Sequence, residues 1–140
     1  MGMEKYESKQ RQILKPAALI YNLISDFTVF TPAVQDKVEG WSATRDECSF
    51  KVKGFTVALR IDEKVENKHV KITGDPSSGV PIDFSFWIQL HEVSENDTRI
   101  RMVLHAELNM MMRMMIGSKI QGGLDKAVEG LAMAFNQMPY

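Results

Sequence analysis

Apolar and polar residues alternate with a period of two through most of the chain between residues 38 and 109. This alternation is typical of strands that bury one face. The runs that show it are 41–43, 48–52, 55–61, 70–72, 82–90 and 100–108. Turn-forming residues separate them at 45–47, 53–54, 66–67, 76–81 and 94–97. The middle of the chain therefore predicts six antiparallel strands.

Strand pairing follows from the requirement that opposed residues share a face. A two-residue turn at 53–54, with glycine second, opposes Val52 to Phe55, and a two-residue turn at 66–67 opposes Ile61 to Ile72. Both turns leave the apolar residues on one face.

The last hairpin needs an odd loop, because a four-residue loop at 94–97 would set apolar residues against polar ones. We predict a loop at 95–97, which pairs Leu90 with Met102 and places Trp87 directly opposite His105.

Helical spacing appears at both ends of this region. After a weakly patterned first strand within residues 4–14, Lys15-Pro16 reads as a helix start. Ser25 and Asp26 then end that helix and cap a short second one, which we expect to close near Thr31-Pro32. The tail predicts one long helix from about residue 112 to 137, with Gly122-Gly123 inside it as a place of close approach.

Length, charge and cysteine content limit the number of domains and the classes of partner and site. A chain of 140 residues fits one domain, residues 1–140, in which Met1-Gly2 resembles an expression scar. A net charge of -1 argues against a nucleic-acid partner. The single cysteine, Cys48, excludes an intrachain disulfide and a Cys-rich zinc site. No signal peptide or membrane-length apolar run is present, so we expect a cytoplasmic protein without stable membrane insertion.

Two segments resemble a known superfamily. They are KPAALIYNLISDF at 15–27 and LNMMMRMMIGSKIQGGLDKAVEGLA at 108–132. With the element order, they are similar to the START-like, or SRPBCC, superfamily of birch-pollen-allergen-like proteins, polyketide cyclases and lipid-transfer domains. The resemblance implies an α+β helix-grip fold: a curved antiparallel sheet of about seven strands around a long C-terminal helix, with two short helices after strand one. It also implies a hydrophobic cavity.

The predicted inner face carries almost no acid–base chemistry. Cys48 is its one titratable residue, and a small buried apolar role suits it better than a nucleophilic one. Capping explains Asp26 without a function. We therefore predict no catalytic residue, no cofactor and no metal site.

We expect a small hydrophobic or amphipathic ligand between sheet and C-terminal helix, bound without catalysis. The candidate wall consists of Phe30, Trp41, Phe50, Val57, Leu59, Phe86, Ile88, Met102, Leu104, Met115, Ile120 and Leu124. A filled core without a ligand stays open as an alternative. So does a cyclase or aromatase, which would use a polar group such as Tyr21, Asp26 or Arg113.

A third hypothesis is a chaperone-associated interaction module that acts through an outward face bearing Trp87 and two histidines, His91 and His105. For that face itself we prefer the interpretation as a plain cross-strand surface pair. Nothing in the sequence indicates a homodimer.

Six of the ten methionines lie within 102–115. They form either an adaptable entrance to the ligand site or filler where the sheet meets the helix.

Overall fold

The structure is a computed structural model that describes residues 3–52, 54–75 and 82–139. Predictions that concern Met1-Gly2, Lys53 and the turn at 76–81 lie outside the described residues.

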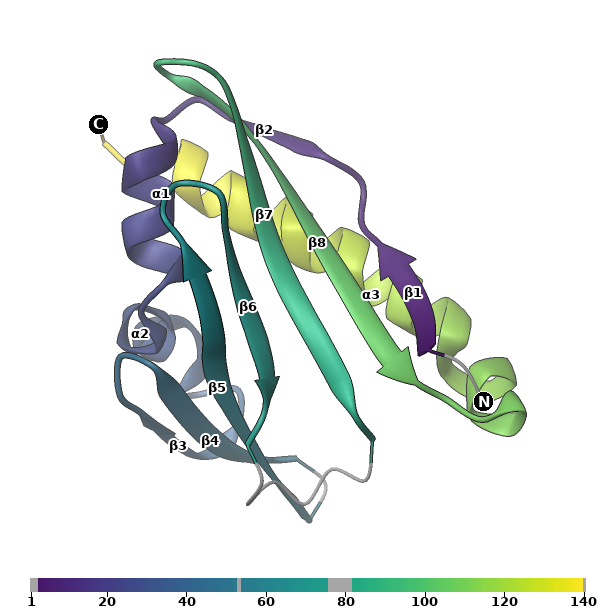
Figure 1. Cartoon of the computed structure of the whole chain (residues 1–140). Coiled ribbons are helices and arrows are strands. Elements are labelled where there is room, and N and C mark those ends of the chain that lie inside the picture. Colours follow the sequence, from purple (N-terminus) through teal and green to yellow (C-terminus); the bar gives the residue numbers. More distant parts are fainter. Residues whose placement is uncertain (1–2, 53, 76–81, 140) are drawn as a thin grey trace.

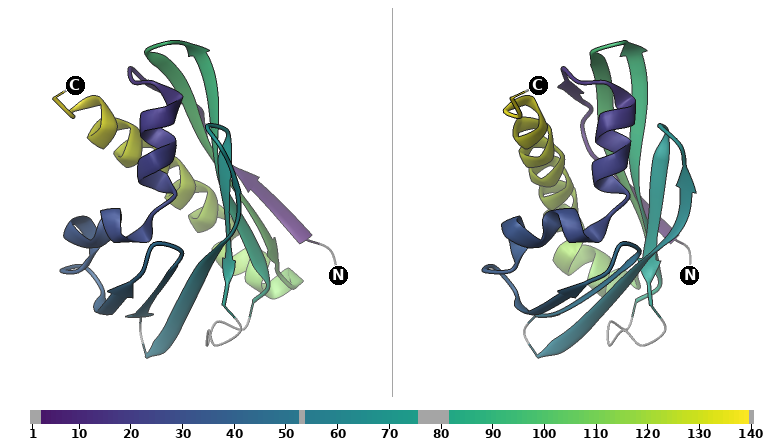
Figure 2. Two further views of the ribbon diagram at one scale, coloured as in Figure 1. Left: turned by 60° about the vertical axis from the view of Figure 1, so that its left-hand side comes forward. Right: turned by 90° about the vertical axis from the view of Figure 1, so that its left-hand side faces the viewer.

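The described residues form one antiparallel sheet of eight strands with helices on one of its faces (Figures 1 and 2). The strands are β1 (Met3–Glu7), β2 (Arg11–Ile13), β3 (Glu39–Ala43), β4 (Glu47–Val52), β5 (Phe55–Val65), β6 (His69–Gly74), β7 (Phe84–Ser94) and β8 (Asp97–Glu107). The helices are α1 (Ala17–Ile24), the 3-10 helix η1 (Phe27–Phe30), α2 (Thr31–Val34) and α3 (Met110–Asn136). The strand order is β1-β8-β7-β6-β5-β4-β3, and β2 also pairs with β8. This confirms the helix-grip α+β prediction.

The first strand is broken into β1 and β2 at Ser8. Ser8 donates its backbone N–H to the Met102 carbonyl at 2.8 Å, and its hydroxyl oxygen accepts from the Met102 N–H at 2.9 Å. Its side-chain oxygen thus takes the place of a backbone acceptor, so the chain bends and continues as a second strand along β8. This break gives eight strands where about seven were predicted.

The first N-terminal helix begins and ends as predicted, whereas the helical segment that follows ends later than predicted. Pro16 precedes α1, and the Asp26 carboxylate caps η1 by accepting from the Thr28 N–H at 2.9 Å. The predicted end near Thr31-Pro32 is wrong, because α2 continues to Val34 with its proline in the first turn. A first-turn residue needs no N–H, so proline fits there.

Two hairpin registers are confirmed. Val52 pairs with Phe55, and Ile61 pairs with Ile72. The two-residue turn predicted at 66–67 is wrong, since Val65 pairs with His69 and three residues separate them. A register shift between Ile61 and Glu63 restores the predicted pairing further along the strands.

The register predicted for the last hairpin is wrong by two residues. Ser94 pairs with Asp97 across a two-residue tip, and a register shift lies between Glu92 and Ser94. Leu90 therefore pairs with Ile100. A shift of two residues keeps every side chain on its predicted face, because the side-chain period of a strand is two.

The long helix α3 matches the predicted tail helix. The side-chain oxygen of Asn109 accepts a hydrogen bond from the Met112 N–H at 2.8 Å and so caps the N-terminus of α3. The close approach expected at Gly122-Gly123 is wrong, because a Cβ there would meet nothing within 4 Å. The close approach lies at Gly117, where a Cβ would stand 3.2 Å from the Tyr6 hydroxyl.

Helix α3 also binds the backbone of the edge strands. The Asp125 carboxylate accepts from the Lys9 N–H at 2.8 Å, and the Gln121 amide donates to the Glu7 carbonyl at 2.7 Å. The Asn136 amide accepts from the Leu14 N–H at 2.7 Å and donates to the Gln12 carbonyl at 2.9 Å. These side chains fix the helix along β1 and β2.

No single helix of the described chain has both the length and the apolar composition needed to cross a membrane. The α1 segment and the Phe27–Val34 segment have the required length and apolar composition only when they are taken together, and they are bent by 85° relative to each other.

Candidate functional site

The deep part of the candidate wall is a packed core. Ile88, Met102 and Leu124 are 4%, 5% and 8% exposed and pack with α1, β2 and the C-terminal half of α3. Phe86, Leu104 and Ile120 lie against this cluster and stay partly exposed. The sheet alternation places the four strand residues among these, and the helical repeat places Leu124 and Ile120.

The second part of the wall surrounds Phe27, Cys48 and Ile72, which are buried beneath η1. The candidates that pack around them and stay partly exposed are Phe30, Trp41, Phe50 and Leu59. Phe86 touches both clusters, so the two parts form one continuous apolar surface. Phe27 was not among the predicted wall residues, although its place at the end of the first helical stripe pointed inward.

Trp41 is held in one orientation in this second cluster. Its indole N–H donates to the Thr31 hydroxyl at 2.8 Å, and its ring centroid lies 6.0 Å from that of Phe50. The polar edge of the indole is therefore satisfied within the protein, and the ring is left to line apolar space.

Two of the candidate wall residues, Val57 and Met115, belong to neither of these two clusters. Val57 is partly exposed toward the tip of the β4–β5 hairpin, and Met115 is 66% exposed. Met115 lies five residues before Ile120, or about 140° around a helix of 3.6 residues per turn. Met112 and Ile116, which lie between these directions, are half-buried.

The wall is open on one side because α3 does not run along the middle of the sheet. It packs mainly on β1, β2 and β8 at one edge, while η1 and α2 adjoin the opposite part (Figure 2). Inward side chains of β4 and β5 such as Phe50, Val57 and Leu59 therefore stay partly exposed. The arrangement offers an apolar surface that a hydrophobic molecule can cover.

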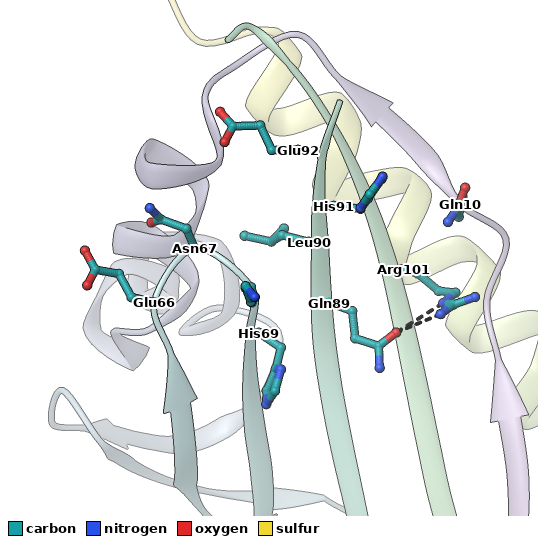
Figure 3. A pocket seen from close by; sticks show the side chains of 10 residues that line it. Gln10, Glu66, Asn67, His69, Gln89, Leu90, His91, Glu92 and Arg101 are labelled. Carbon is teal, nitrogen blue, oxygen red and sulfur yellow. Dashed lines mark hydrogen bonds between the residues drawn. The ribbon is translucent and has the colours of Figure 1, made fainter. Parts of the chain in front are cut away.

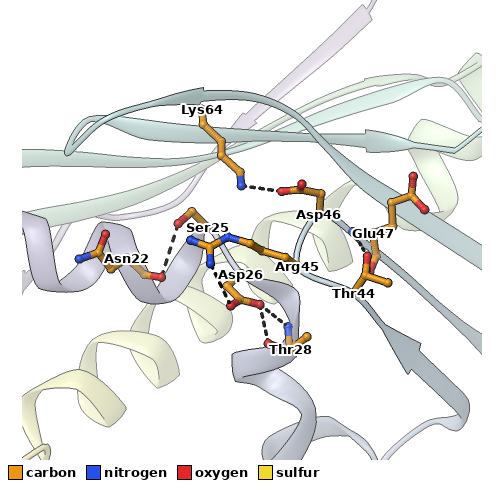
Figure 4. Close-up of polar contacts among 9 residues, drawn as sticks. All are labelled: Asn22, Ser25, Asp26, Thr28, Thr44, Arg45, Asp46, Glu47 and Lys64. Atoms are coloured by element: carbon orange, nitrogen blue, oxygen red, sulfur yellow. Dashed lines mark hydrogen bonds and ion pairs between the residues drawn. The ribbon is translucent and has the colours of Figure 1, made fainter.

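Two of the three polar groups considered for catalysis, Asp26 and Arg113, form their polar contacts outside the wall. Asp26 accepts from the Thr28 N–H and hydroxyl and lies 4.0 Å from Arg45, at the outer end of η1 (Figure 4). The Thr28 hydroxyl hydrogen bond, first of all, holds the pKa of Asp26 below its ordinary value. Arg113 donates to Glu4 of β1 at 2.6 Å, and Tyr21 packs against the deep core.

Cys48 is 5% exposed, and burial raises the pKa of its thiol to about 11. A protonated thiol is a poor nucleophile at neutral pH, which fits a small apolar residue. Within the described chain no group of three or more His, Cys, Asp or Glu residues is placed to hold a metal ion.

Two neighbouring polar hollows lie on the outer face of the sheet. The larger, about 660 Å³, contains His69, His91 and Glu92 and reaches Gln89 and Arg101 (Figure 3). The smaller, about 220 Å³, shares Gln89 and Arg101 and extends to Trp87 and β1. Each of the three histidines of the chain lines one of the two hollows: His69 and His91 line the larger, and His105 lines the smaller.

Trp87 and His105 are in contact, although not as predicted. Trp87 pairs with Val103 and His105 pairs with Ser85, so the two rings meet diagonally at a centroid distance of 4.7 Å. The sequence analysis also missed Lys5 and Glu7, which join this face from β1; their alternation with Tyr6 was the available signal.

Comparisons with known proteins identify the fold. No model of a known protein family and no curated protein matches the chain. Among solved structures, norcoclaurine synthase from Thalictrum flavum, in complex with dopamine and hydroxybenzaldehyde, has a TM-score of 0.73 at 8% identity, over 99% of this chain and 91% of that one.

Two further structures agree. A START superfamily protein from Mycobacterium smegmatis has a TM-score of 0.60 at 14% identity, over 94% of this chain and 99% of that one. The protein Ara h 8.0201 has a TM-score of 0.60 at 18% identity, over 95% and 99%. At these identities the likeness concerns the fold, and the chain has the START-like helix-grip fold that its sequence resembles.

Proposed function

We propose that this protein binds a small hydrophobic or amphipathic molecule between the inner face of its sheet and α3, without chemical turnover. The observation that carries the proposal is the continuous apolar surface from Ile88 to Trp41, whose outer half stays partly exposed. Each 100 Å² of apolar ligand surface buried there contributes roughly 2.5 kcal/mol.

The wall's chemistry supports binding over turnover. Its residues carry no acid or base apart from the protonated Cys48 thiol, while Asp26 and Arg113 are paired outside it. General acid–base catalysis needs a proton carrier within hydrogen-bond reach of the substrate. The complex of norcoclaurine synthase with two small aromatic molecules supports ligand binding by this fold. Because that protein is an enzyme, it also supports the cyclase-like alternative.

Native mass spectrometry of freshly purified protein tests the proposal. We expect a fraction of the protein to carry a non-covalent organic adduct that is lost on denaturation and recovered by solvent extraction. The second measurement is Trp41 emission in a Trp87→Phe background during titration with 1-anilinonaphthalene-8-sulfonate. Trp41 lines the wall and Trp87 lies on the opposite face, so the emission change reports the inner site alone.

The outcomes separate the alternatives. A protein free of adduct, with Trp41 emission unmoved by the probe, would show a filled core and overturn the proposal. A bound molecule that is converted on incubation would favour the cyclase-like enzyme instead.

A further inference from the structure

The smaller outer hollow has an apolar floor. Val103 points away from the core on β8, yet it is 3% exposed. It lies in register between Glu7 of β1 and Trp87 of β7. The Lys71 ammonium stands 5.5 Å from the Trp87 ring centroid, which adds to the order of that ring. The hollow therefore joins a valine floor to an aromatic wall.

The rim of this hollow is mainly cationic. Lys5 and Arg101 line it, and Glu7 is the one carboxylate among its described lining residues. The Lys5 ammonium lies 2.9 Å from Glu7, and an Arg101 terminal nitrogen lies 3.7 Å from the other Glu7 oxygen. Two cations against one anion leave an excess of one positive charge at this rim.

Arg101 is held in place by Gln89. Its Nε and Nη2 donate to the Gln89 amide oxygen at 3.2 and 3.0 Å (Figure 3). A guanidinium has donors only, so the amide oxygen must face Arg101 and the amide NH2 group is turned away from it. The NH2 group thus remains a donor beside the hollow. Positioned donors of this kind are typical of carboxylate recognition.

We propose that this hollow binds a small aromatic carboxylate. Its ring would lie against Trp87, above the buried Val103, and its carboxylate would accept from Arg101, Lys5 and the Gln89 amide. A volume of about 220 Å³ equals roughly seven water volumes, which suits a single-ring acid and not a lipid. The site is separate from the inner wall, because the two lie on opposite faces of the sheet.

Glu7 is the internal competitor for this ligand. The Lys5 ammonium, foremost, and then Arg101 and His105 hold the pKa of Glu7 below its ordinary value, so Glu7 is ionised at neutral pH. Its carboxylate occupies the two cations in the absence of ligand. Removing that charge should free Lys5 and Arg101 for an incoming carboxylate.

Benzoate titration of the full chain tests the site, followed by Trp87 emission in a Trp41→Phe background and by amide NMR shifts. We expect Arg101→Gln to weaken binding at least fivefold and Glu7→Gln to strengthen it at least threefold. Arg99→Gln is the matched control, since Arg99 lies on the same strand and face but pairs with Asp97 outside the hollow. Its affinity should stay within twofold of the unaltered chain.

Two further probes separate charge from ring. Benzyl alcohol lacks the carboxylate and acetate lacks the ring, so both should bind at least tenfold more weakly than benzoate. Equal effects of Arg99→Gln and Arg101→Gln, or a decrease in affinity with Glu7→Gln, would refute the site. If benzoate shifts only the amide NMR signals of Trp41 and its neighbours in the unaltered chain, the molecule binds at the inner wall, and the proposed outer site is also refuted.

Discussion

Leu104→Trp distinguishes a ligand wall from a filled core. Leu104 and Met102 point inward from the same strand, two residues apart. Leu104 is partly exposed, whereas Met102 is 5% exposed within the deep cluster. A larger side chain at the first position enters the open part of the wall, and one at the second must displace packed neighbours.

The magnitude follows from overpacking. Extra volume forced into a packed core costs about 1–3 kcal/mol, so Met102→Trp should lower the free energy of unfolding by about 2 kcal/mol. With a urea dependence of about 2 kcal/mol per M, the unfolding midpoint falls by about 1 M. Leu104→Trp should leave the midpoint within about 0.3 M, because the larger ring extends into the partly exposed part of the wall and displaces no packed neighbour.

Urea unfolding followed by far-ultraviolet circular dichroism measures both variants, and titration with 1-anilinonaphthalene-8-sulfonate measures occupancy of the wall. We expect Leu104→Trp to abolish probe binding while the protein stays folded. Equal destabilisation by the two substitutions would refute the reasoning, since it would show that Leu104 is as tightly packed as Met102.

Three other predictions concern separate features. Asn109→Ala removes the acceptor of the Met112 N–H and should lower the free energy of unfolding by about 1 kcal/mol, measured in urea, with Asn109→Ser as the capping control. The Cys48 pKa rises in the folded chain from 9.0 to about 11, so between these pH values only the unfolded chain ionises and stability should fall as pH rises; Cys48→Ala should flatten that part of the stability curve, and an unchanged slope would contradict the burial. Hydrogen peroxide should oxidise the five exposed methionines of α3 before the buried Met102, as read by peptide mass spectrometry; uniform oxidation would contradict the exposures. These five are Met110, Met111, Met114, Met115 and Met133.

Face assignments could be predicted from the sequence more reliably than registers. Alternation placed Ile88, Met102 and Leu104 inward, and the structure agrees. The pairing of Trp87 was wrong because the observed register of β7 and β8 differs from the predicted one by two residues, and an even difference leaves no trace in the hydrophobic pattern. Irregularities of this kind depend on local backbone geometry that residue types do not specify.

The candidate wall was predictable where strands supply it and less so on α3. Ile120 and Leu124 face the core, but Met115 points to solvent, since five methionines among residues 110–115 give no amphipathic pattern that sets the rotation of the helix. The outer hollow was not predicted, because it depends on Lys5 and Glu7 reaching β8 from the other end of the chain.

The hydrogen bonds from α3 to the edge strands bear on self-association. An exposed strand edge offers unpaired N–H and C=O groups on which another chain can pair and extend the sheet. Asp125, Gln121 and Asn136 occupy such groups at Lys9, Glu7, Leu14 and Gln12. The helix therefore seals one border of the sheet against edge-to-edge polymerisation, and a chain that lost its hold on these strands would become prone to aggregate before it unfolded.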